Sequence, residues 1–474
     1  MTTTTQEAAE ATSARTPSVA PGGLPVLGHA LEMKRRPGEF FLSLQQGEPV
    51  VRLRLGRAAV YAVNDPALIR GLLLDPATFA RGGPVTERFR QMFGNGLGIS
   101  DGEVHRRQRA LLAPAFSPPR VAGYSAVMTD VADTTAGRWR EGQVVQVEKE
   151  MDELSLSVIT RVMFSDDVGL DRARFMEATG TVLGGLFKRV TDATGIVTRL
   201  PTPANRRYDE AAAYLRRTID QVIEHYRSHG ADRGDLLSLM MCAADEDGPA
   251  MSDEQLHDEV MTMFIAGSNT ISNTLAWALY EADTHPEVRS RLHAEVDEVL
   301  DGRPAEHGDV SALDYTRRVI SETLRVRTQG LFLAKVTAKP AELGGYAIPE
   351  GATVMYSAHA LNHNPEIHPD PERFDPDRWL PERAERIPKG AFMPFATGVH
   401  SCIAQHFAWT EMVIALATIV ARWELTTIPG HVPQPKLAIT MPVDSLPMTP
   451  RRRVRESAAR SGNQPQPVGA RNGR

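Results

Sequence analysis

The chain has very little cysteine: its 474 residues include two, Cys242 and Cys402. No disulfide framework can therefore support the fold, and a reducing compartment suits it. The chain also lacks the run of roughly 18 uncharged apolar residues that a membrane-spanning helix needs. Its Thr- and Ala-rich start lacks the basic-then-apolar order of a signal peptide. These absences predict a cytoplasmic protein with no membrane anchor.

Charge of one sign is not in large excess either. A formal net charge of −6 argues against a nucleic-acid binder or a dedicated binder of anionic membranes. No Gly/Ser-rich or Pro-rich linker and no internal repeat interrupts the patterned part of the chain. We therefore expect one large domain over residues 21–450, between a disordered segment at 1–20 and a disordered basic tail at 451–474.

The apolar periodicity predicts a mainly α fold with a minor β part. A helical period covers residues 206–229, and a second one covers 252–284. The second helix opens on Ser252 as N-cap, with Gln255 at the capping-box position. At about 1.5 Å per residue a helix of this length reaches nearly 50 Å, so we expect it to cross the centre of the domain. Alternating segments predict strands at 50–55, 59–63, 346–349 and 352–356.

Cys402 stands between a small Gly-containing loop and an apolar helix expected over residues 407–423. The positive end of a helix favours a thiolate at this place. No second cysteine is near in the sequence, so neither a local disulfide nor a Cys-rich zinc site is indicated. A lone thiolate suggests an axial ligand of haem iron. Taken alone, Cys402 is equally consistent with a small buried cysteine, and Cys242 is expected to face the core.

The spacing around Cys402 favours the ligand interpretation. Phe395, Gly398, His400 and Cys402 follow one another at intervals that resemble the haem-ligand loop of the cytochrome P450 monooxygenases. Ala404 stands where that family usually has glycine. The resemblance implies haem b as cofactor, with Cys402 as the axial ligand of the iron and the only metal ligand of the chain.

Glu322 and Arg325 lie three positions apart in a helical segment, within reach of each other. Alone, they are most simply an exposed ion pair worth under about 1 kcal/mol. The segment 371–379 that follows resembles the family's Pro-Glu-Arg-Phe segment after its Glu-x-x-Arg helix. By that resemblance Glu322, Arg325 and Arg373 would form a buried charge network, a role that suits a guanidinium forked to a carboxylate.

The expected central helix carries Ala266, Gly267, Asn269 and Thr270 near its middle. A glycine inside a helix costs roughly 1 kcal/mol relative to alanine. It either leaves room for a flat ligand or serves helix packing beside a back-bonded threonine. The family pattern here ends in an acid and a threonine, which implies oxygen activation through Thr270. Asn269 replaces the acid, so the family's proton route does not carry over.

His105 and Arg109 share one helical face and would suit a pair of carboxylates, although a solvated basic helix start fits equally well. By resemblance, these two residues with His400 and Lys335 would bind the haem propionates. Lys335 stands where the family usually has arginine. The segment with His359, His363 and His368 is not expected to bind metal, because no helical His-Glu-x-x-His motif is present.

The resemblance spans residues 21–450 and implies a haem monooxygenase that inserts one oxygen atom from O2. The chain looks most like longer bacterial members that oxidise terpenes, which favours an apolar substrate, a sesquiterpene by analogy. The expected pocket lining consists of Phe264, Ile265, Thr328, Gln329, Gly330, Leu331, Phe332 and Leu333. Peroxide-driven or non-oxygenase haem-thiolate chemistry and a non-catalytic haem carrier remain alternatives. No flavin or nicotinamide segment is present, so a ferredoxin and its reductase would supply electrons to a monomer.

Overall fold

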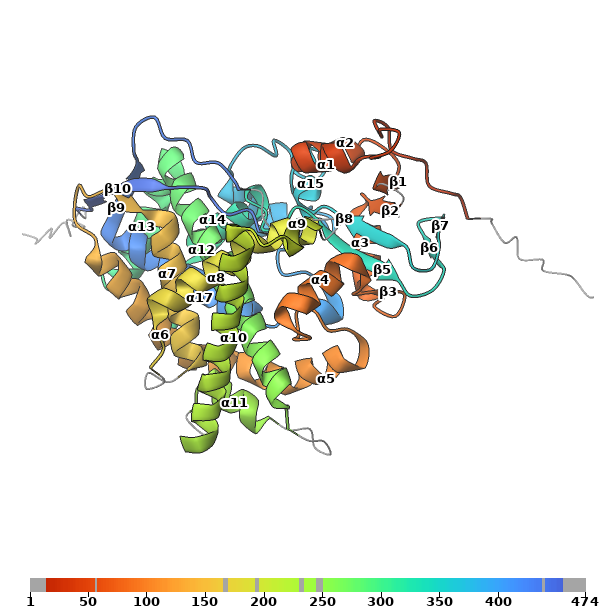
Figure 1. Ribbon diagram of the computed structural model, residues 1–474. Helices are drawn as coiled ribbons and strands as arrows, with labels where there is room; N and C mark the ends of the chain where they lie inside the picture. Colours follow the sequence, from red (N-terminus) through yellow and green to blue (C-terminus); the bar gives the residue numbers. More distant parts are fainter. Residues whose placement is uncertain are drawn as a thin grey trace, which may run out of the picture.

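The computed structural model describes residues 14–55, 58–164, 169–191, 196–229, 234–243, 250–436 and 440–454. Its α-helices are α1 Ala30–Arg35, α2 Pro37–Leu44, α3 Pro66–Leu74, α4 Gly83–Phe93, α5 Gly102–Leu112, α6 Pro118–Arg138, α7 Val147–Met163, α8 Arg172–Thr191, α9 Ile196–Arg199, α10 Pro203–His229, α11 Leu236–Cys242, α12 Asp253–Thr284, α13 Pro286–Leu300, α14 Asp314–Val326, α15 Ala358–Asn362, α16 Pro381–Ala384 and α17 Gln405–Arg422. Short 3₁₀ helices are η1 Ala113–Phe116, η3 His307–Asp309, η4 Pro376–Trp379 and η5 Gly398–His400. Helices make up most of the molecule, the sheet with β1, β2, β5 and β8 lies toward one side and β9 and β10 lie at the opposite side, so the expected mainly α class is confirmed (Figure 1).

The strands form three small sheets. They are β1 Val50–Leu55, β2 Ala58–Val63, β3 Phe79–Ala80, β4 Val145–Gln146, β5 Leu333–Thr337, β6 Ala341–Leu343, β7 Tyr346–Ile348, β8 Thr353–Tyr356, β9 Trp423–Thr427 and β10 Pro447–Arg452. The largest sheet has the order β1-β2-β8-β5-β3. β1 and β2 pair antiparallel, as expected for a hairpin, and β5 pairs antiparallel with β8. This sheet places Leu333 and Lys335 of β5 on the same face, because side chains alternate along a strand.

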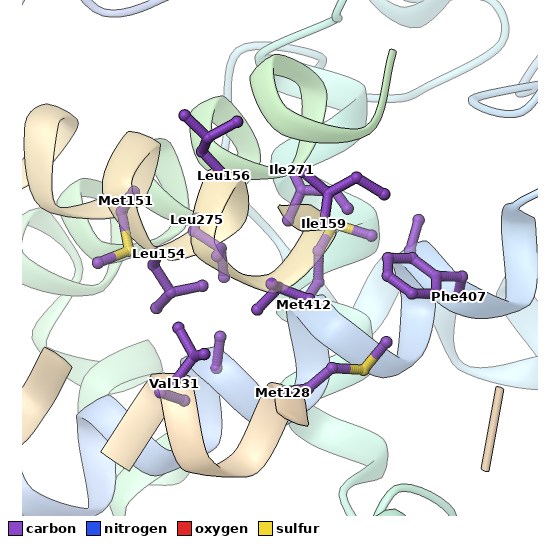
Figure 2. Packing of buried hydrophobic residues seen from close by; sticks show 14 of the residues in the cluster. Met128, Val131, Met151, Leu154, Leu156, Ile159, Ile271, Leu275, Phe407 and Met412 are labelled. Atoms are coloured by element: carbon purple, nitrogen blue, oxygen red, sulfur yellow. The ribbon is translucent and has the colours of Figure 1, made fainter. Parts of the chain in front are cut away.

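The long helix α12 is the axis of the helical part. It spans 32 residues, and Ser252 caps it by accepting a hydrogen bond from Gln255 N–H at 3.2 Å, which confirms the predicted start. Figure 2 shows Ile271 and Leu275 of α12 meeting Ile159 of α7 and Met412 of α17 in one apolar core. Burial of this core fixes α12 against its neighbours, so side chains on its remaining face are held in place.

Both ends of the domain extend beyond the predicted boundaries. Arg15 N–H donates to Gly345 O at 2.8 Å and Ala20 N–H donates to Arg52 O at 3.0 Å. At the other end, Arg453 donates to Val420 O at 3.0 Å and pairs with Asp297 at 2.6 Å. The prediction of disorder was therefore wrong for residues 14–20 and 451–453, because backbone pairing and helix capping need no large apolar side chains. Residues 1–13 and 455–474 lie outside the described part.

Cys242 is exposed at the last position of α11, so the expectation that it faces the core was wrong. Leu236, Leu237 and Met240 bury one face of this short helix, and its final residue has left that face. Among the described helices, none combines the length and the apolar character needed to cross a membrane.

Candidate active site

The loop before α17 holds Cys402 in a tight backbone arrangement. Cys402 N–H donates to Phe395 O at 2.8 Å, and Gly398 adopts φ +74°. A Cβ atom at Gly398 would lie 2.6 Å from Leu73 O, so only glycine fits there. Ala396 is also in the left-handed region, at φ 56°. Phe395 and Gly398 thus set the shape of the loop that presents the cysteine.

The Cys402 side chain is exposed, and yet burial raises the pKa of its thiol. Both observations hold together if the sulfur faces a hollow that protein atoms surround. The Ala404 N–H and the positive charge of Arg109 act in the opposite direction and lower the pKa. The expected help of the helix N-terminus is not dominant, because α17 begins only at Gln405.

The middle of α12 has an exposed alanine among buried neighbours. Ala266 is exposed although Met263, Phe264 and Ser268 around it are buried. Thr270 lies one turn further on the same face, and its hydroxyl donates to Ala266 O at 2.8 Å. The threonine is therefore back-bonded, and its oxygen lone pairs stay available as acceptors. We infer that Ala266 and Thr270 border an interior hollow.

Gly267 and Asn269 both lie against other segments of the chain. A Cβ atom at Gly267 would meet Ile159 of α7 at 3.5 Å, an ordinary packing contact. The glycine therefore lies near the α12–α7 contact, in keeping with the helix-packing alternative, and room for a ligand beside it stays a prediction. Asn269 Oδ1 accepts hydrogen bonds from Thr440 and Asn273, so its amide is engaged with the C-terminal part of the chain.

Three basic side chains, those of Arg81, Arg109 and Lys335, gather where the sheet meets α5 and the Cys402 loop. Lys335 Nζ lies 3.1 Å from His400 Nδ1, and His400 Nε2 lies 2.9 Å from Asp101 Oδ1. Arg109 donates to Ser401 O at 2.7 Å. The ring of His105 packs 4.5 Å from that of His400, and Arg81 donates to Leu97 O and Ser100 O. The structure thus brings together His105, Arg109, Lys335 and His400, the four residues expected to bind propionates.

Burial, with smaller effects of neighbouring charges, shifts the pKa values of several groups in this cluster. Burial, together with Arg81, lowers the pKa of Lys335 to about 8. Burial and the same arginine lower the pKa of His105 to about 4. Burial alone would raise the pKa of Asp101, but hydrogen bonds from His400 and from the N–H groups of Gly102 and Arg81 bring it far below its usual range. Burial thus disfavours the charged forms of Lys335 and His105, and hydrogen bonds hold Asp101 as an anion.

The surplus charge fits the haem group. Arg81, Arg109 and Lys335 are three basic side chains, and Asp101 is the carboxylate that acts on Arg81 and Lys335 within the described residues. Two positive charges remain unmatched, which two propionates would neutralise. Together with an exposed thiol at Cys402 and an exposed Ala266, this donor set suits a planar dianionic ligand with an iron atom at its centre.

A second charge network lies behind this site. Glu322 and Arg325 are both fully buried and pair at 2.8 and 3.0 Å, so the predicted buried pair is present. The second arginine that contacts Glu322 is Arg378, which is buried and donates to Glu322 at 3.3 Å. The side chain of Arg373 is exposed, and only its carbonyl accepts from Arg325. The assignment of Arg373 to the network was therefore wrong, because η4 turns Arg378 inward instead.

Three functional residues were missed in the sequence. Arg81 follows the two-residue strand β3 and gives no local signal of its role. Arg378 lies in the same motif as Arg373, and residue type could not choose between them. Asp101 did carry a signal, since an Asp-Gly pair before an apolar period marks the N-cap of α5, where it accepts from Gly102 N–H.

The expected pocket lining holds only in part. Phe264 stacks between Phe164 and Phe175 in the core, and Phe332 packs against Phe41 on the other face of the sheet. Leu331 and Thr328 are buried. Leu333 is 52% exposed on the face of β5 that it shares with Lys335. The run of residues 331–333 alternates across the sheet instead of facing the pocket together.

No group of three or more His, Cys, Asp or Glu side chains in the described ranges could hold a metal ion. His368 has no hydrogen-bond partner on either ring nitrogen among those residues, and burial lowers its pKa to about 3. It is therefore a neutral core histidine.

Comparison with known proteins gives a consistent result. A family model described as "Cytochrome P450" matches residues 17–450. "Cyclooctat-9-en-7-ol 5-monooxygenase" of Streptomyces melanosporofaciens is 43% identical over 88% of this chain and 91% of the relative. "Cyclooctatin synthase" of the same organism is 40% identical over 91% and 95%. "Pentalenene oxygenase" of Streptomyces avermitilis is 38% identical over 86% and 91%. The crystal structure of the "cytochrome P450DA heme domain" superposes with a TM-score of 0.83 at 30% identity, covering 93% of this chain and 98% of that one.

Proposed function

The chain belongs to the cytochrome P450 family, and from that premise we propose that it inserts one oxygen atom from O2 into an apolar terpene. The observation that carries the chemistry is the exposed Cys402 thiol beside a cluster with two unmatched positive charges. A protein that stored or sensed haem would need neither the exposed Ala266 nor a threonine one turn away from it. These features favour an oxygenase.

Haem, when bound, would supply activation of O2, and the Cys402 sulfur would hold its iron. Arg81, Arg109 and Lys335 would hold the propionates by charge-assisted hydrogen bonds. His105 is a neutral donor within the same cluster. Thr270 would accept a hydrogen bond from a water in the hollow and order it there, since its own proton is donated to Ala266 O.

The substrate is proposed from the relatives and from the character of the pocket. The relatives' names state that they act on cyclooctat-9-en-7-ol or pentalenene, or make cyclooctatin. Leu333 offers an apolar surface without hydrogen-bonding groups. A sesquiterpene hydrocarbon such as pentalenene, oxidised at an unactivated carbon, is our first candidate. Cyclooctat-9-en-7-ol is our second candidate substrate, because the relative named for it is 43% identical to this chain.

Electrons would come from separate proteins, a ferredoxin and its reductase, since the matched residues 17–450 form the cytochrome P450 unit itself. The protein would work as a monomer in the cytoplasm, in keeping with its two unpaired cysteines. Docking of the ferredoxin would take place on the side of Cys402, which shortens the path of the electron.

Replacement of Cys402 tests the haem-thiolate assignment. Reduced, CO-treated protein should show the red-shifted Soret band of a thiolate-ligated haem, and Cys402→Ala should lose this band. Cys242→Ala is the matched control, since it removes the other exposed cysteine and should keep the band. A Cys402→Ala protein that retains the band contradicts the assignment.

Turnover under two conditions separates oxygenase from peroxide-driven chemistry. With NADPH and surrogate redox partners, the wild type should form product, and Thr270→Ala should release more peroxide for each NADPH consumed. Turnover on peroxide alone, with equal coupling in wild type and Thr270→Ala, would instead favour the non-oxygenase alternative.

A spectral screen tests the substrate class. Pentalenene or cyclooctat-9-en-7-ol should shift the ferric Soret band to shorter wavelength. An apolar pocket discriminates by only about 1–3 kcal/mol per methylene, so related hydrocarbons should also bind. A shift with a polar macrolide and none with either terpene would leave the monooxygenase assignment intact and remove the terpene.

A further inference from the structure

Asn269, which stands where the family carries an acid, is tied to the C-terminal part of the chain. Its Oδ1 accepts from Thr440 Oγ1 at 2.7 Å and from Asn273 Nδ2 at 3.1 Å. Asn273 Nδ2 also lies 3.3 Å from Thr440 Oγ1. The three side chains form a closed triangle of hydrogen bonds between α12 and Thr440.

Trp277 makes a further contact with the C-terminal part of the chain from the same side of α12 as Asn269 and Asn273. Trp277 Nε1 donates to Met441 O at 3.3 Å. Asn269, Asn273 and Trp277 follow at intervals of four residues, so they lie above one another on one side of the helix. The helix thus holds two consecutive residues of the C-terminal segment along two turns.

Thr440 and Met441 belong to a hairpin, which we call the C-terminal hairpin (residues 434–436 and 440–444). Its base is closed by a bridge between Pro435 and Val443. Lys436 N–H donates to Pro442 O at 2.7 Å, and Asp444 N–H donates to Gln434 O at 2.9 Å. The described part of the hairpin is therefore a paired unit that can move as one body if its contacts with α12 are lost.

The side of α12 with these three residues lies next to the face that borders the hollow. Asn269 directly precedes Thr270, and Asn273 directly precedes Thr274, whose hydroxyl donates to Thr270 O at 2.8 Å. Successive residues of a helix are about 100° apart around its axis, which follows from 3.6 residues per turn. The C-terminal hairpin is thus held beside Thr270, at the edge of the space where a substrate would lie.

We propose that Asn269 is a positioning residue: with Asn273 it tethers the C-terminal hairpin beside Thr270 and so fixes one wall of the substrate site. The inference rests on the proposed function for the identity of that site. The amide oxygen already accepts from both Thr440 and Asn273, and an amide cannot ionise. Aspartate would accept the same two hydrogen bonds, so the tether should survive Asn269→Asp.

Hydrogen–deuterium exchange on the haem-loaded full chain tests the tether without any substrate. In Asn269→Ala and in Thr440→Val, the amides of Lys436 and Asp444 should exchange roughly fivefold faster, the effect of losing about one hydrogen bond. The double variant should exchange little faster than either single one, because both remove the same contact. Asn269→Asp should match the wild type.

Ser268→Ala is the matched control, since it also removes a buried hydroxyl of α12 but one that bonds Phe264 O and not the hairpin. It should leave exchange at Lys436 and Asp444 unchanged. Unchanged exchange in Asn269→Ala, or equal acceleration in Asn269→Asp, would overturn the proposal.

Pentalenene then tests the consequence for the substrate. Asn269→Ala and Thr440→Val should bind it several-fold more weakly in the ferric spectral assay and give a broader set of products, while Asn269→Asp keeps both properties. An altered product set in Asn269→Asp alone would contradict a positioning role. If pentalenene gives no shift even in the wild type, the proposed substrate fails, and the exchange data still decide the tether.

Discussion

The molecule has two clusters of charged side chains, one around Glu322 and one around Lys335, and they differ in burial and in how many basic side chains share one carboxylate. In the Glu322 cluster, the carboxylate accepts five hydrogen bonds, from Arg325 (two), Arg378, Trp379 and the Asp375 N–H. The remaining guanidinium groups of Arg325 and Arg378 donate to backbone carbonyls, among them those of residues 362 and 369. This cluster is complete within the protein.

In the Lys335 cluster, the basic side chains of Arg81, Arg109 and Lys335 have Asp101 as their carboxylate, and the pKa of Lys335 falls to about 8 because of burial and Arg81. The Glu322 cluster is fully buried and has two arginines for one carboxylate, whereas Arg81, Asp101 and Arg109 of the Lys335 cluster are only half-buried and three basic side chains share one carboxylate. From this comparison we infer that a network whose hydrogen bonds close within the protein stabilises the fold, and that the larger surplus of basic side chains around Lys335 is where an anionic ligand would bind.

Removal of Glu322 should have the largest effect. Glu322→Ala leaves Arg325 and Arg378 buried without a carboxylate, at a cost of about 3–5 kcal/mol, so little haem-loaded protein should form. Haem content and the thermal midpoint measure this loss. Glu103→Ala is the control: it removes an acid with the same i,i+3 spacing to an arginine, but both side chains are about three-quarters exposed, so it should cost under about 1 kcal/mol. A Glu322→Ala protein as stable as this control would show that the cluster does not hold the fold.

Comparison of Arg378→Ala with Arg373→Ala sharpens the membership of the Glu322 cluster. Arg378→Ala removes buried hydrogen bonds to Glu322 and Pro369 O and should cost about 2–3 kcal/mol. Arg373→Ala truncates an exposed side chain and should stay within about 0.5 kcal/mol. Urea unfolding measures both variants. The reverse order would return Arg373 to the network.

His368 makes the Glu322 cluster sensitive to acid. Its folded-state pKa is about 3, lowered by burial and then by Arg325, Arg378 and His363, against an ordinary value of 6.5. Between these values the unfolded chain binds the extra proton, so stability falls as pH decreases below 6.5. His368→Leu should remove about 1–2 kcal/mol of the loss between pH 7.5 and pH 5 in urea unfolding. Parallel pH curves for the two proteins would mean that His368 is charged in the fold.

Replacement of Lys335 should have the smallest effect, and the property that changes should be haem retention and not fold stability. Lys335→Met reduces the surplus charge, so it should speed transfer of haem to apomyoglobin about tenfold, through loss of a charge-assisted hydrogen bond, with little loss of fold stability. Lys335→Arg should retain haem at least as well as the wild type. Lys339→Met, an exposed lysine four positions on, is the control and should not change the rate. Wild-type retention by Lys335→Met would mean that the cluster does not bind the cofactor.

Prediction from sequence succeeded where the signal was local. The Ser252 cap, the spacing of Glu322 and Arg325 and the loop of Cys402 involve residues within a few positions of one another, and the structure has each of them. It failed where one of two similar choices depended on packing. Arg373 and Arg378 belong to the same motif, and only the fold shows that Arg378, in η4, is buried while Arg373 is exposed. The contact of Gly267 with Ile159 likewise involves a residue of α7, which is distant in the sequence.

The amino-acid sequence by itself determined the helical period of α12, its cap, the ion pair at Glu322 and the cysteine that would bind iron. Short-range hydrogen bonds and side-chain periodicity fix these features whatever surrounds them. The tertiary structure alone decided that Asp101 meets His400 across 299 positions and that Thr440 meets Asn269 across 171. Such contacts arise only when burial of the common core brings distant segments together, so no local pattern encodes them.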